Sequence, residues 1–506
     1  MPSRAVHRPG AQAIVLSIIM MSGALADPPL TFGPAGSVEG GVKVFYDQVQ
    51  PDGSLRGGSR LVRGESLGRW VGLVPISDVT MVLEPQGVGA NGDNRFDLVF
   101  VGDGYRGPPP PTIANTTAVP PDENLPPTAT DFQNYERHVG GALYRLFDIE
   151  PFRRYRPVFR SFRVDVRSNE SGVSNDPVEG VMRDTAMDMR FWCDGVERLL
   201  CVNTIAAQQY ADQAPFLDLI VAVANSTKYG GSGYLGQNVL TISGGSSTAY
   251  HVTAHEIGHV LGILADEYAV DELFEWPGGE PSDPNLSTFE APDMVALNGK
   301  WAAWIGNDLP GFDGPIWTYE GGGFYQGGVF RPSPNSAMRT IGRPFNVVAL
   351  ERLVVGIYTR VDPIDSVSPA SAVATPNTVF SVEPIPVVGA PLTVQWFLNG
   401  MPLSVPVENV FDLSTITLPP GIHQVSARVT DPTTFVRSQA LREQWLTQTR
   451  NWIVEVPAAG AAGASLTDAA AALRQWGESG AGLEGDVNRD GRVDLRDLLR
   501  ALGARE

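Results

Sequence analysis

Two histidines and a glutamate near the middle of the 506-residue chain have the types and spacing that hydrolytic metal chemistry requires. His255 and His259 are four residues apart, so on a helix both imidazoles lie on one face and can reach a single zinc ion. Glu256 directly follows His255, where its carboxylate can accept a proton from a zinc-bound water. The pattern therefore predicts a helix that carries two zinc ligands and a general base.

A catalytic zinc takes three protein ligands, and the third must come from outside this helix. His251 lies one turn earlier on the same face, but three ligands along one straight helix would span about 12 Å. We therefore expect His251 to be structural or to support a ligand. Gly262 is typical of a helix end in a left-handed turn, which would send the chain back under the metal. We predict Asp266 as the third ligand, with Glu267 as the alternative.

Buried strands and helices alternate around this motif. Residues 96–101 and 217–223 are nearly continuous apolar runs, which indicates strands buried on both faces. Helical spacing is found at 132–147, and a strand is expected at 159–166. Strands and helices in this order indicate an α/β domain, which we expect to extend over residues 91–360.

These segments resemble the M64 family of metallopeptidases. The likeness covers residues 90–360, and it rests on the run from His255 to Tyr268, on residues 96–105 and 193–199, and on Ser336-Ala-Met338-Arg339. The resemblance implies a zincin catalytic domain of the metzincin type, with Met338 in the methionine turn beneath the zinc. It departs from the general metzincin pattern at Ala265, because the acid stands one residue later.

The resemblance also implies hydrolysis of peptide bonds by a zinc-activated water, with Glu256 as the general base. Tyr268 can hydrogen-bond the oxyanion of a tetrahedral intermediate, and packing is the alternative role for its ring. The strand expected at 238–243 would be an edge along which an extended peptide pairs. The expected substrates are proteins or peptides, among which a glycoprotein is one candidate.

The alternative function is that of a non-catalytic surface adhesion or scaffold protein with a zincin-like binding domain. The intact trio His255, Glu256 and His259 favours the enzyme, because a protein that only binds has no need of the base. The formal net charge of −19 argues against nucleic acids and anionic membrane surfaces as partners.

The first 26 residues have the features of a signal peptide. Basic residues precede the apolar run 13–21, and Ala24-Leu25-Ala26 follows as a cleavage site. We therefore expect a secreted, extracellular protein, and no later apolar run is long enough to span a membrane. In that compartment Cys193 and Cys201 are predicted to form a disulfide, with two free buried thiols as the alternative.

Further domains are expected on both sides of the catalytic one. Short strands between Gly-rich turns predict an N-terminal β domain at 27–90. Alternating apolar and polar residues predict an immunoglobulin-like β-sandwich at 375–456. An Ala/Gly-rich linker at 457–465 leads to two helical runs within 466–506.

A calcium loop is predicted inside that last segment. Acidic and amide side chains recur at the positions of a calcium-binding loop, and Gly491 stands at its sixth, turning position. The loop ligands are Asp486, Asn488, Asp490, Arg492, Asp494 and Asp497. An acidic turn without metal is the alternative. The aspartate at position 12 and the single following helix resemble a dockerin-type module, which implies a cohesin-like or cell-surface partner; a calcium-stabilised cap is the other reading.

Overall fold

The computed structural model describes most of the chain from Val42 to Pro457. The described residues are 42–50, 55–62, 76–87, 89, 92–107, 129–403 and 409–457, with ten further positions between 475 and 494. The signal peptide predicted at 1–26 lies outside them, as do nearly all of the linker and most of the dockerin-like segment. Asn488, Asp490 and Asp497 of the calcium loop are also outside, so that site stays a prediction.

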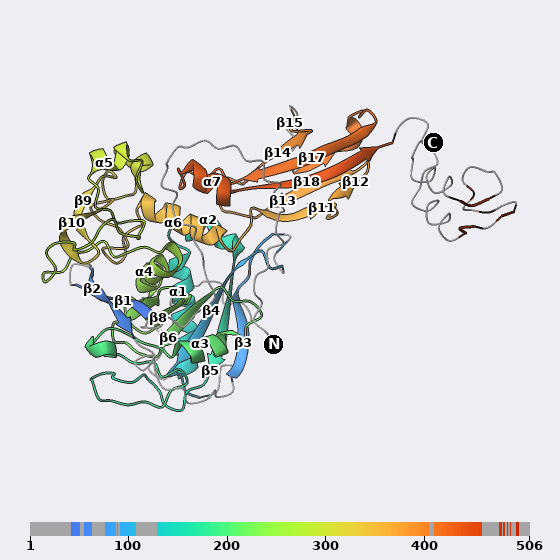
Figure 1. The fold of residues 1–506 in the computed structure, drawn as a ribbon. Coiled ribbons are helices and arrows are strands. Elements are labelled where there is room, and N and C mark those ends of the chain that lie inside the picture. The colour runs from blue at the N-terminus through green and yellow to red at the C-terminus, as the bar shows by residue number, and fades with distance from the viewer. Residues whose placement is uncertain are drawn as a thin grey trace. The chain divides into compact units, whose positions relative to one another are not determined.

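The body that carries the histidines is built on one mixed sheet, with strand order β2-β1-β7-β8-β6-β4-β5-β3 (Figure 1). Its strands are β1 (Val42–Val49), β2 (Leu55–Val62), β3 (Ile76–Leu83), β4 (Phe96–Asp103), β5 (Phe159–Val166), β6 (Leu219–Ala224), β7 (Gly231–Tyr234) and β8 (Val239–Ser243). The central strands β5, β4, β6 and β8 run parallel and are buried along their whole length. This explains their continuous apolar sequences and confirms a mixed α/β architecture.

Helices cover both faces of the sheet. The helices are α1 (Asp131–Leu146), α2 (Phe152–Tyr155), α3 (Thr204–Ala211), α4 (Ala249–Gly262), α5 (Ala291–Ala296), α6 (Val347–Tyr358) and α7 (Gln439–Trp445), with short 3-10 turns η2 (Arg156–Val158), η3 (Cys193–Gly195), η4 (Ala302–Trp304) and η5 (Leu413–Thr415). Val101 of β4 belongs to the core cluster under α3, whereas a Cβ at the next residue, Gly102, would contact Tyr135 of α1. Successive strand residues face opposite sides, so α1 and α3 lie on opposite faces.

The N-terminal strands do not form a domain of their own, contrary to the expectation for 27–90. β1 and β2 extend the main sheet beyond β7, and β3 pairs with β5 at the other edge. Short strands separated by turns are compatible with either arrangement, because the pairings of β3 with β5 and of β1 with β7 join residues 78 to 190 positions apart. The predicted disulfide is confirmed, since Cys193 is bonded to Cys201.

Between α4 and α6 the chain forms an irregular region with a two-stranded sheet, β9 (Tyr319–Gly322) and β10 (Tyr325–Arg331). Core residues of this region include Trp301 and Trp304, which pack against Val347 and Val348 at the start of α6. Among the described residues, no helix combines the length and apolar character that a membrane crossing requires.

A second β unit follows α6 and consists of two sheets. One sheet has the order β11-β13-β16 and the other β12-β18-β17-β14-β15. Their strands are β11 (Ile364–Ser368), β12 (Val373–Ala374), β13 (Val379–Pro384), β14 (Thr393–Leu398), β15 (Met401–Pro402), β16 (Val410–Asp412), β17 (Gly421–Thr430) and β18 (Thr447–Val456). Phe380 of the first sheet contacts Trp396 and Trp452 of the second. The unit begins at Ile364 rather than 375, and its immunoglobulin-like class stays a prediction.

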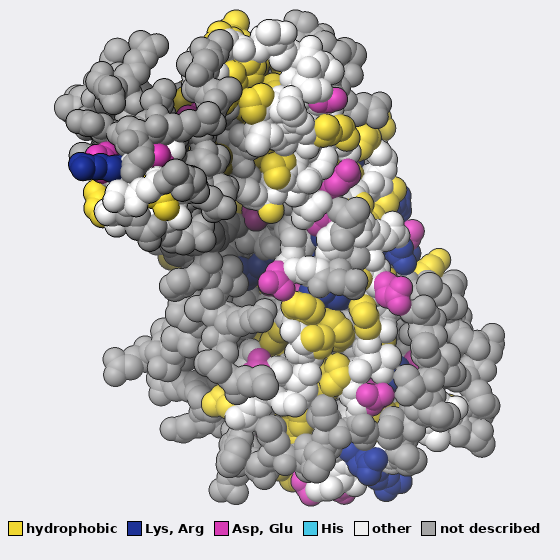
Figure 2. Space-filling view, turned by 90° about the vertical axis from the view of Figure 1, so that its right-hand side faces the viewer, with side chains coloured by type: hydrophobic (Ala, Val, Ile, Leu, Met, Phe, Trp, Pro, Cys, Tyr) yellow, Lys and Arg dark blue, Asp and Glu magenta, His cyan; other side chains and the backbone are white. Residues whose placement is uncertain are grey.

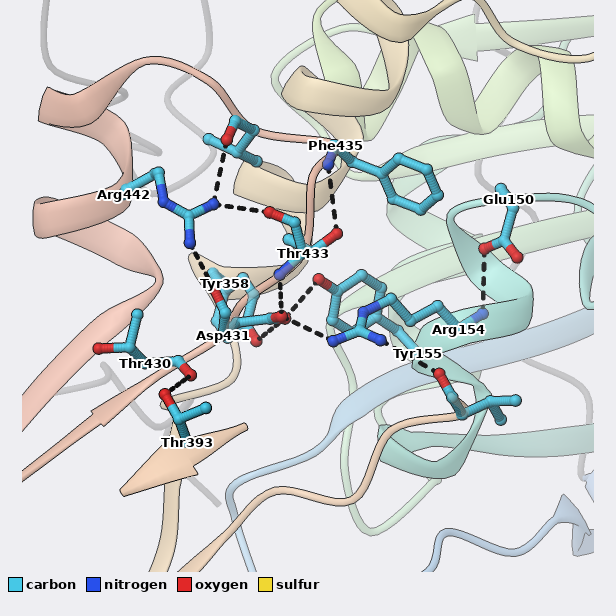
Figure 3. A network of polar contacts seen from close by, with 12 residues as sticks. Glu150, Arg154, Tyr155, Tyr358, Thr393, Thr430, Asp431, Thr433, Phe435 and Arg442 are labelled. Atoms are coloured by element: carbon cyan, nitrogen blue, oxygen red, sulfur yellow. Dashed lines mark hydrogen bonds and ion pairs between the residues drawn. The ribbon is translucent and has the colours of Figure 1, made fainter. Parts of the chain in front are cut away.

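One buried carboxylate joins this unit to the α/β body. Asp431, which follows β17, accepts hydrogen bonds from Arg154 Nη2, Tyr155 Oη and Tyr358 Oη, each at 2.7 Å (Figure 3). Asp431 is fully buried, so its charge depends on Arg154 and on the two phenol groups for compensation. The contacts tie the β unit to α2 and α6.

Candidate metal centre

Helix α4 presents the two predicted histidine ligands on one face. It runs from Ala249 to Gly262, and the Nε2 atoms of His255 and His259 lie 3.0 Å apart. Both side chains are buried, with 1% and 0% of their surface exposed. The predicted helix and the shared face of its two histidines are therefore confirmed.

The backbone fixes which nitrogen of each imidazole carries the proton. His255 Nδ1 lies 2.9 Å from the carbonyl oxygen of Ala337, and His259 Nδ1 lies 2.7 Å from that of Leu264. A carbonyl oxygen can only accept, so each Nδ1 is the donor. In the neutral imidazole, Nε2 then carries the lone pair, and the two lone pairs face each other. This is the tautomer in which histidine binds a metal through Nε2.

Asp266 completes the group. Its Oδ1 lies 3.2 Å from His255 Nε2 and 3.4 Å from His259 Nε2, and the three ligand atoms are within 4.8 Å of one another. Burial raises the pKa of Asp266, and positive charge at His259 and His255 would lower it. A cation between this fully buried carboxylate and the two imidazole lone pairs would supply that positive charge.

This donor set fits a metal cation. Within the described part of the chain, neither oxygen of Asp266 receives a hydrogen bond, although both are buried. Two imidazole lone pairs and a carboxylate converge there. Burying three acceptors together costs free energy unless a positive charge lies between them. Two nitrogens and one oxygen are ligands that zinc accepts in catalytic sites, where a fourth position stays open.

The turn that brings Asp266 to the histidines differs in detail from the prediction. The left-handed residue after the helix is Ile263, with φ 55° and ψ 35°, and not Gly262. Gly262 is the last helical residue, and a Cβ there would lie 2.9 Å from Leu264 Cγ. The glycine is thus needed for close packing, while the chain reversal is taken by the next residue.

Glu267, the alternative third ligand, lies in a different place. Its Oε1 accepts hydrogen bonds from Asn285 Nδ2 at 3.0 Å and Asn346 Nδ2 at 2.9 Å, and its Oε2 accepts one from Ser336 Oγ at 2.6 Å. Its backbone N–H donates to Met338 O at 2.8 Å. Glu267 therefore connects the loop that carries Asp266 to the turn around Met338. Sequence reasoning missed its three partners, because nothing in their local sequence indicates contact with a residue this far away.

Met338 lies directly against the histidine helix. A Cβ at Gly258 would come within 2.6 Å of Met338 Sδ, so the glycine makes room for the thioether. The neighbouring Ala337 supplies the carbonyl that holds His255. The turn therefore both packs against α4 and orients one histidine, while its metzincin-type role stays a prediction.

Glu256 faces strand β7. Its side chain is fully buried, and a Cβ at Gly231 or Gly233 would lie 3.2 Å from one or the other of its carboxylate oxygens. The two glycines thus leave the space that the carboxylate occupies. The Gly-rich run at 229–234 was visible in the sequence, but its relation to Glu256 was not.

The expected substrate edge at 238–243 is wrong. β8 lies inside the sheet, paired in parallel with β6 and antiparallel with β7, so it has no free edge. Two other candidates, His251 and Tyr268, make contacts with residues outside the histidine group. His251 accepts a hydrogen bond from Arg145 Nε at 3.3 Å, and its structural or supporting role stays a prediction. Tyr268 is buried with its ring against Phe324, so its catalytic role stays a prediction.

The central part of the chain matches a known family. Residues 127–316 match the family model described as IgA Peptidase M64. M64 peptidases are metallopeptidases, so this segment is similar to a metallopeptidase domain. The M64 match includes α4 and Asp266 and ends before Met338. Comparison with curated proteins found no match.

A cavity of about 350 Å³ lies at the other edge of the sheet, away from the M64-like site. It is lined by Met81, Glu84, Pro85, Arg160, Phe162, Pro215 and Phe216. Figure 2 shows hydrophobic side chains gathered among acidic and basic ones on one face of the molecule, and no histidine is visible there. The cavity contains no cluster of metal-ligating residues.

Proposed function

We propose that the chain is a secreted, zinc-dependent endopeptidase. The observation that carries this proposal is the convergence of His255 Nε2, His259 Nε2 and Asp266 Oδ1 within 4.8 Å. These atoms are buried and belong to the segment similar to M64 peptidases. The two histidines come from the helix that also holds Glu256, and Asp266 follows that helix.

His255, His259 and Asp266 would hold the zinc, and each is already supported by the fold. The carbonyls of Ala337 and Leu264 orient the imidazoles, and the Glu267 network holds the loop that carries Asp266. Zinc, when bound, supplies a Lewis acid that polarises the scissile carbonyl and lowers the pKa of the attacking water.

Glu256 is the proposed general base. It follows His255 on the helix, and its carboxylate is enclosed between α4 and the glycines of β7. In this enclosed site, the carboxylate would accept the proton of the attacking water and then deliver it to the leaving amine. Tyr268 is proposed to stabilise the oxyanion of the tetrahedral intermediate.

The alternative function, a non-catalytic adhesion or scaffold protein, makes a different prediction for metal removal. An endopeptidase should lose cleavage of casein or mucin when a chelator removes the zinc and regain it when zinc is restored. The zinc content should be one per chain in the active form. Full zinc content without cleavage of any protein or peptide, in every form of the chain, would favour the alternative.

The C-terminal segment is proposed to bind calcium at Asp486, Asn488, Asp490, Arg492, Asp494 and Asp497. This rests on the sequence pattern, and a cohesin-like or surface partner is proposed from the dockerin-like features. Calorimetric titration of the full chain with calcium tests it, and Asp490→Ala should remove the binding event. Heat of binding that is the same in both proteins would contradict this assignment.

A further inference from the structure

The hairpin of β1 and β2 covers the candidate metal centre. The ring of Phe45, in β1, stacks on the imidazole of His259, with ring centroids 4.3 Å apart and planes only 5° from parallel. Phe45 is itself 2% exposed, so its ring is enclosed together with the histidine. An apolar ring thus covers the face of a predicted zinc ligand.

β1 also occupies the strand position next to the proposed base. It pairs antiparallel with β7 through Val44 and Tyr234, and β7 carries Gly231 and Gly233 against Glu256. An extended peptide that adds a strand to β7 would need this same position. This strand position beside β7 is therefore filled by a segment of the chain itself.

The hairpin is also held through its second strand, β2. The backbone N–H of Leu55, at the start of β2, donates to Arg339 O at 2.9 Å, next to Met338. Nη2 of the following residue, Arg56, lies 3.2 Å from Asp271 Oδ2 and 3.1 Å from Glu272 Oε1. The hairpin thus bridges β7 and the Met338 turn.

The pairing pattern indicates how this cover could leave. β1 pairs with β2 over eight residues, from Val42↔Val62 to Val49↔Leu55. In the described part of the chain, its register with β7 consists of the pair Val44↔Tyr234. More strand pairing therefore holds β1 to β2 than holds β1 to β7, although Val44 of β1 is also packed in the core.

We infer that the β1–β2 hairpin is an autoinhibitory segment that occupies the peptide-binding edge of the site. The inference rests on the proposed function. With the hairpin in place, His255 is 1% exposed and His259, Glu256 and Asp266 are 0% exposed, and the ring of Phe45 covers the imidazole of His259. The partner that takes its place is an extended peptide, paired antiparallel to β7, with a large apolar side chain where Phe45 lies.

Two variants test the inference in the full-length, zinc-loaded chain. Phe45→Ala removes the ring over His259, and Arg56→Glu repels Asp271 and Glu272 without touching the site. Their controls are Phe411→Ala, a buried phenylalanine of the β unit, and Arg153→Glu, an exposed arginine paired with Asp148. Two rates are measured for each protein: cleavage of a fluorogenic peptide mixture, and removal of zinc by EDTA.

Phe45→Ala is expected to raise both rates by about tenfold or more, since the stacked pair and the buried area are lost together. Arg56→Glu is expected to raise them by about two- to fivefold, because its ion pairs are exposed. The controls should match the intact chain. If Phe45→Ala fails to fold, Arg56→Glu still decides the question.

The outcomes separate this inference from the proposed function. Equal rates in all proteins, with cleavage by the intact chain, would overturn the inference and leave the peptidase standing. Faster zinc removal from the two variants without any cleavage would support the hairpin as the cover of the metal and overturn the peptidase assignment.

Discussion

Asp266 and Glu267 are neighbours in the sequence, yet their carboxylates lie in different environments. Asp266 Oδ1 lies 3.2 Å from His255 Nε2, whereas Glu267 Oε2 accepts a 2.6 Å hydrogen bond from Ser336. The first carboxylate is placed to bind a metal, and the second is placed to hold the loop. This division of roles leads to a direct comparison of two variants.

Asp266→Asn should weaken zinc binding by more than about 100-fold, because it removes a ligand charge and a donor. Glu267→Gln should weaken it by about tenfold and lower the free energy of unfolding by about 1–3 kcal/mol, because a buried acceptor is lost. Competitive titration against a chromophoric chelator gives both affinities. A larger loss of affinity in Glu267→Gln than in Asp266→Asn would contradict the assignment of the third ligand.

Gly258 should not tolerate a methyl group. A Cβ there would meet Met338 Sδ at 2.6 Å, so Gly258→Ala should lower the free energy of unfolding by about 1–3 kcal/mol. Gly140→Ala is the matched control, because Gly140 lies inside α1 with nothing within 4 Å of the added Cβ. That variant should gain up to about 1 kcal/mol from helix propensity. Urea unfolding of both variants provides the test, and equal stabilities would refute the packing of Met338 against Gly258.

Acid should destabilise the folded chain through His138. Burial, helped by the positive charge of Arg137, lowers the pKa of His138 to about 3. Arg137 Nη2 lies 3.1 Å from His138 Nε2, and since a guanidinium can only donate, Nε2 must stay unprotonated. The unfolded chain binds this proton below about pH 6.5, so stability present above that pH is lost as the pH falls toward 3.

Because of this one group, the free energy of unfolding should fall by about 1.4 kcal/mol for each pH unit between about pH 6.5 and about pH 3. His138→Gln removes the titration, so its unfolding free energy should fall less steeply between pH 6.5 and 4 than that of the unmodified chain. Urea unfolding at pH 7, 6, 5 and 4 measures both slopes. Parallel slopes would show that His138 is not the group responsible.

The parts of the fold that sequence reasoning predicted are those with a local signature. The spacing of His255 and His259 specifies a helical face, and the apolar runs at 96–101 and 217–223 specify strands buried on both sides. Asp266 could be predicted because the metal needs a third ligand close after the helix. Each of these inferences uses only a short stretch of chain.

The remainder depends on contacts between distant segments. Asn285, Ser336 and Asn346 are polar residues with no distinctive local pattern, and only the fold brings them to Glu267. The pairing of β1 with β7 joins residues about 190 positions apart, so the N-terminal strands looked like a separate domain. The edge strand was misplaced at 238–243 for the same reason: strand order cannot be derived from the alternation within one strand.

Cleavage-site profiling of a peptide library tests the central claim most directly. It compares the Phe45→Ala chain with the double variant Phe45→Ala/Glu256→Gln, both loaded with zinc and with the same zinc content. The account predicts defined cleavage sites for the first protein and a loss of rate of about 10²–10⁴-fold for the second, because the general base is gone. Undiminished cleavage by the double variant, or no cleavage by either zinc-loaded protein, would contradict a zinc endopeptidase with Glu256 as its base.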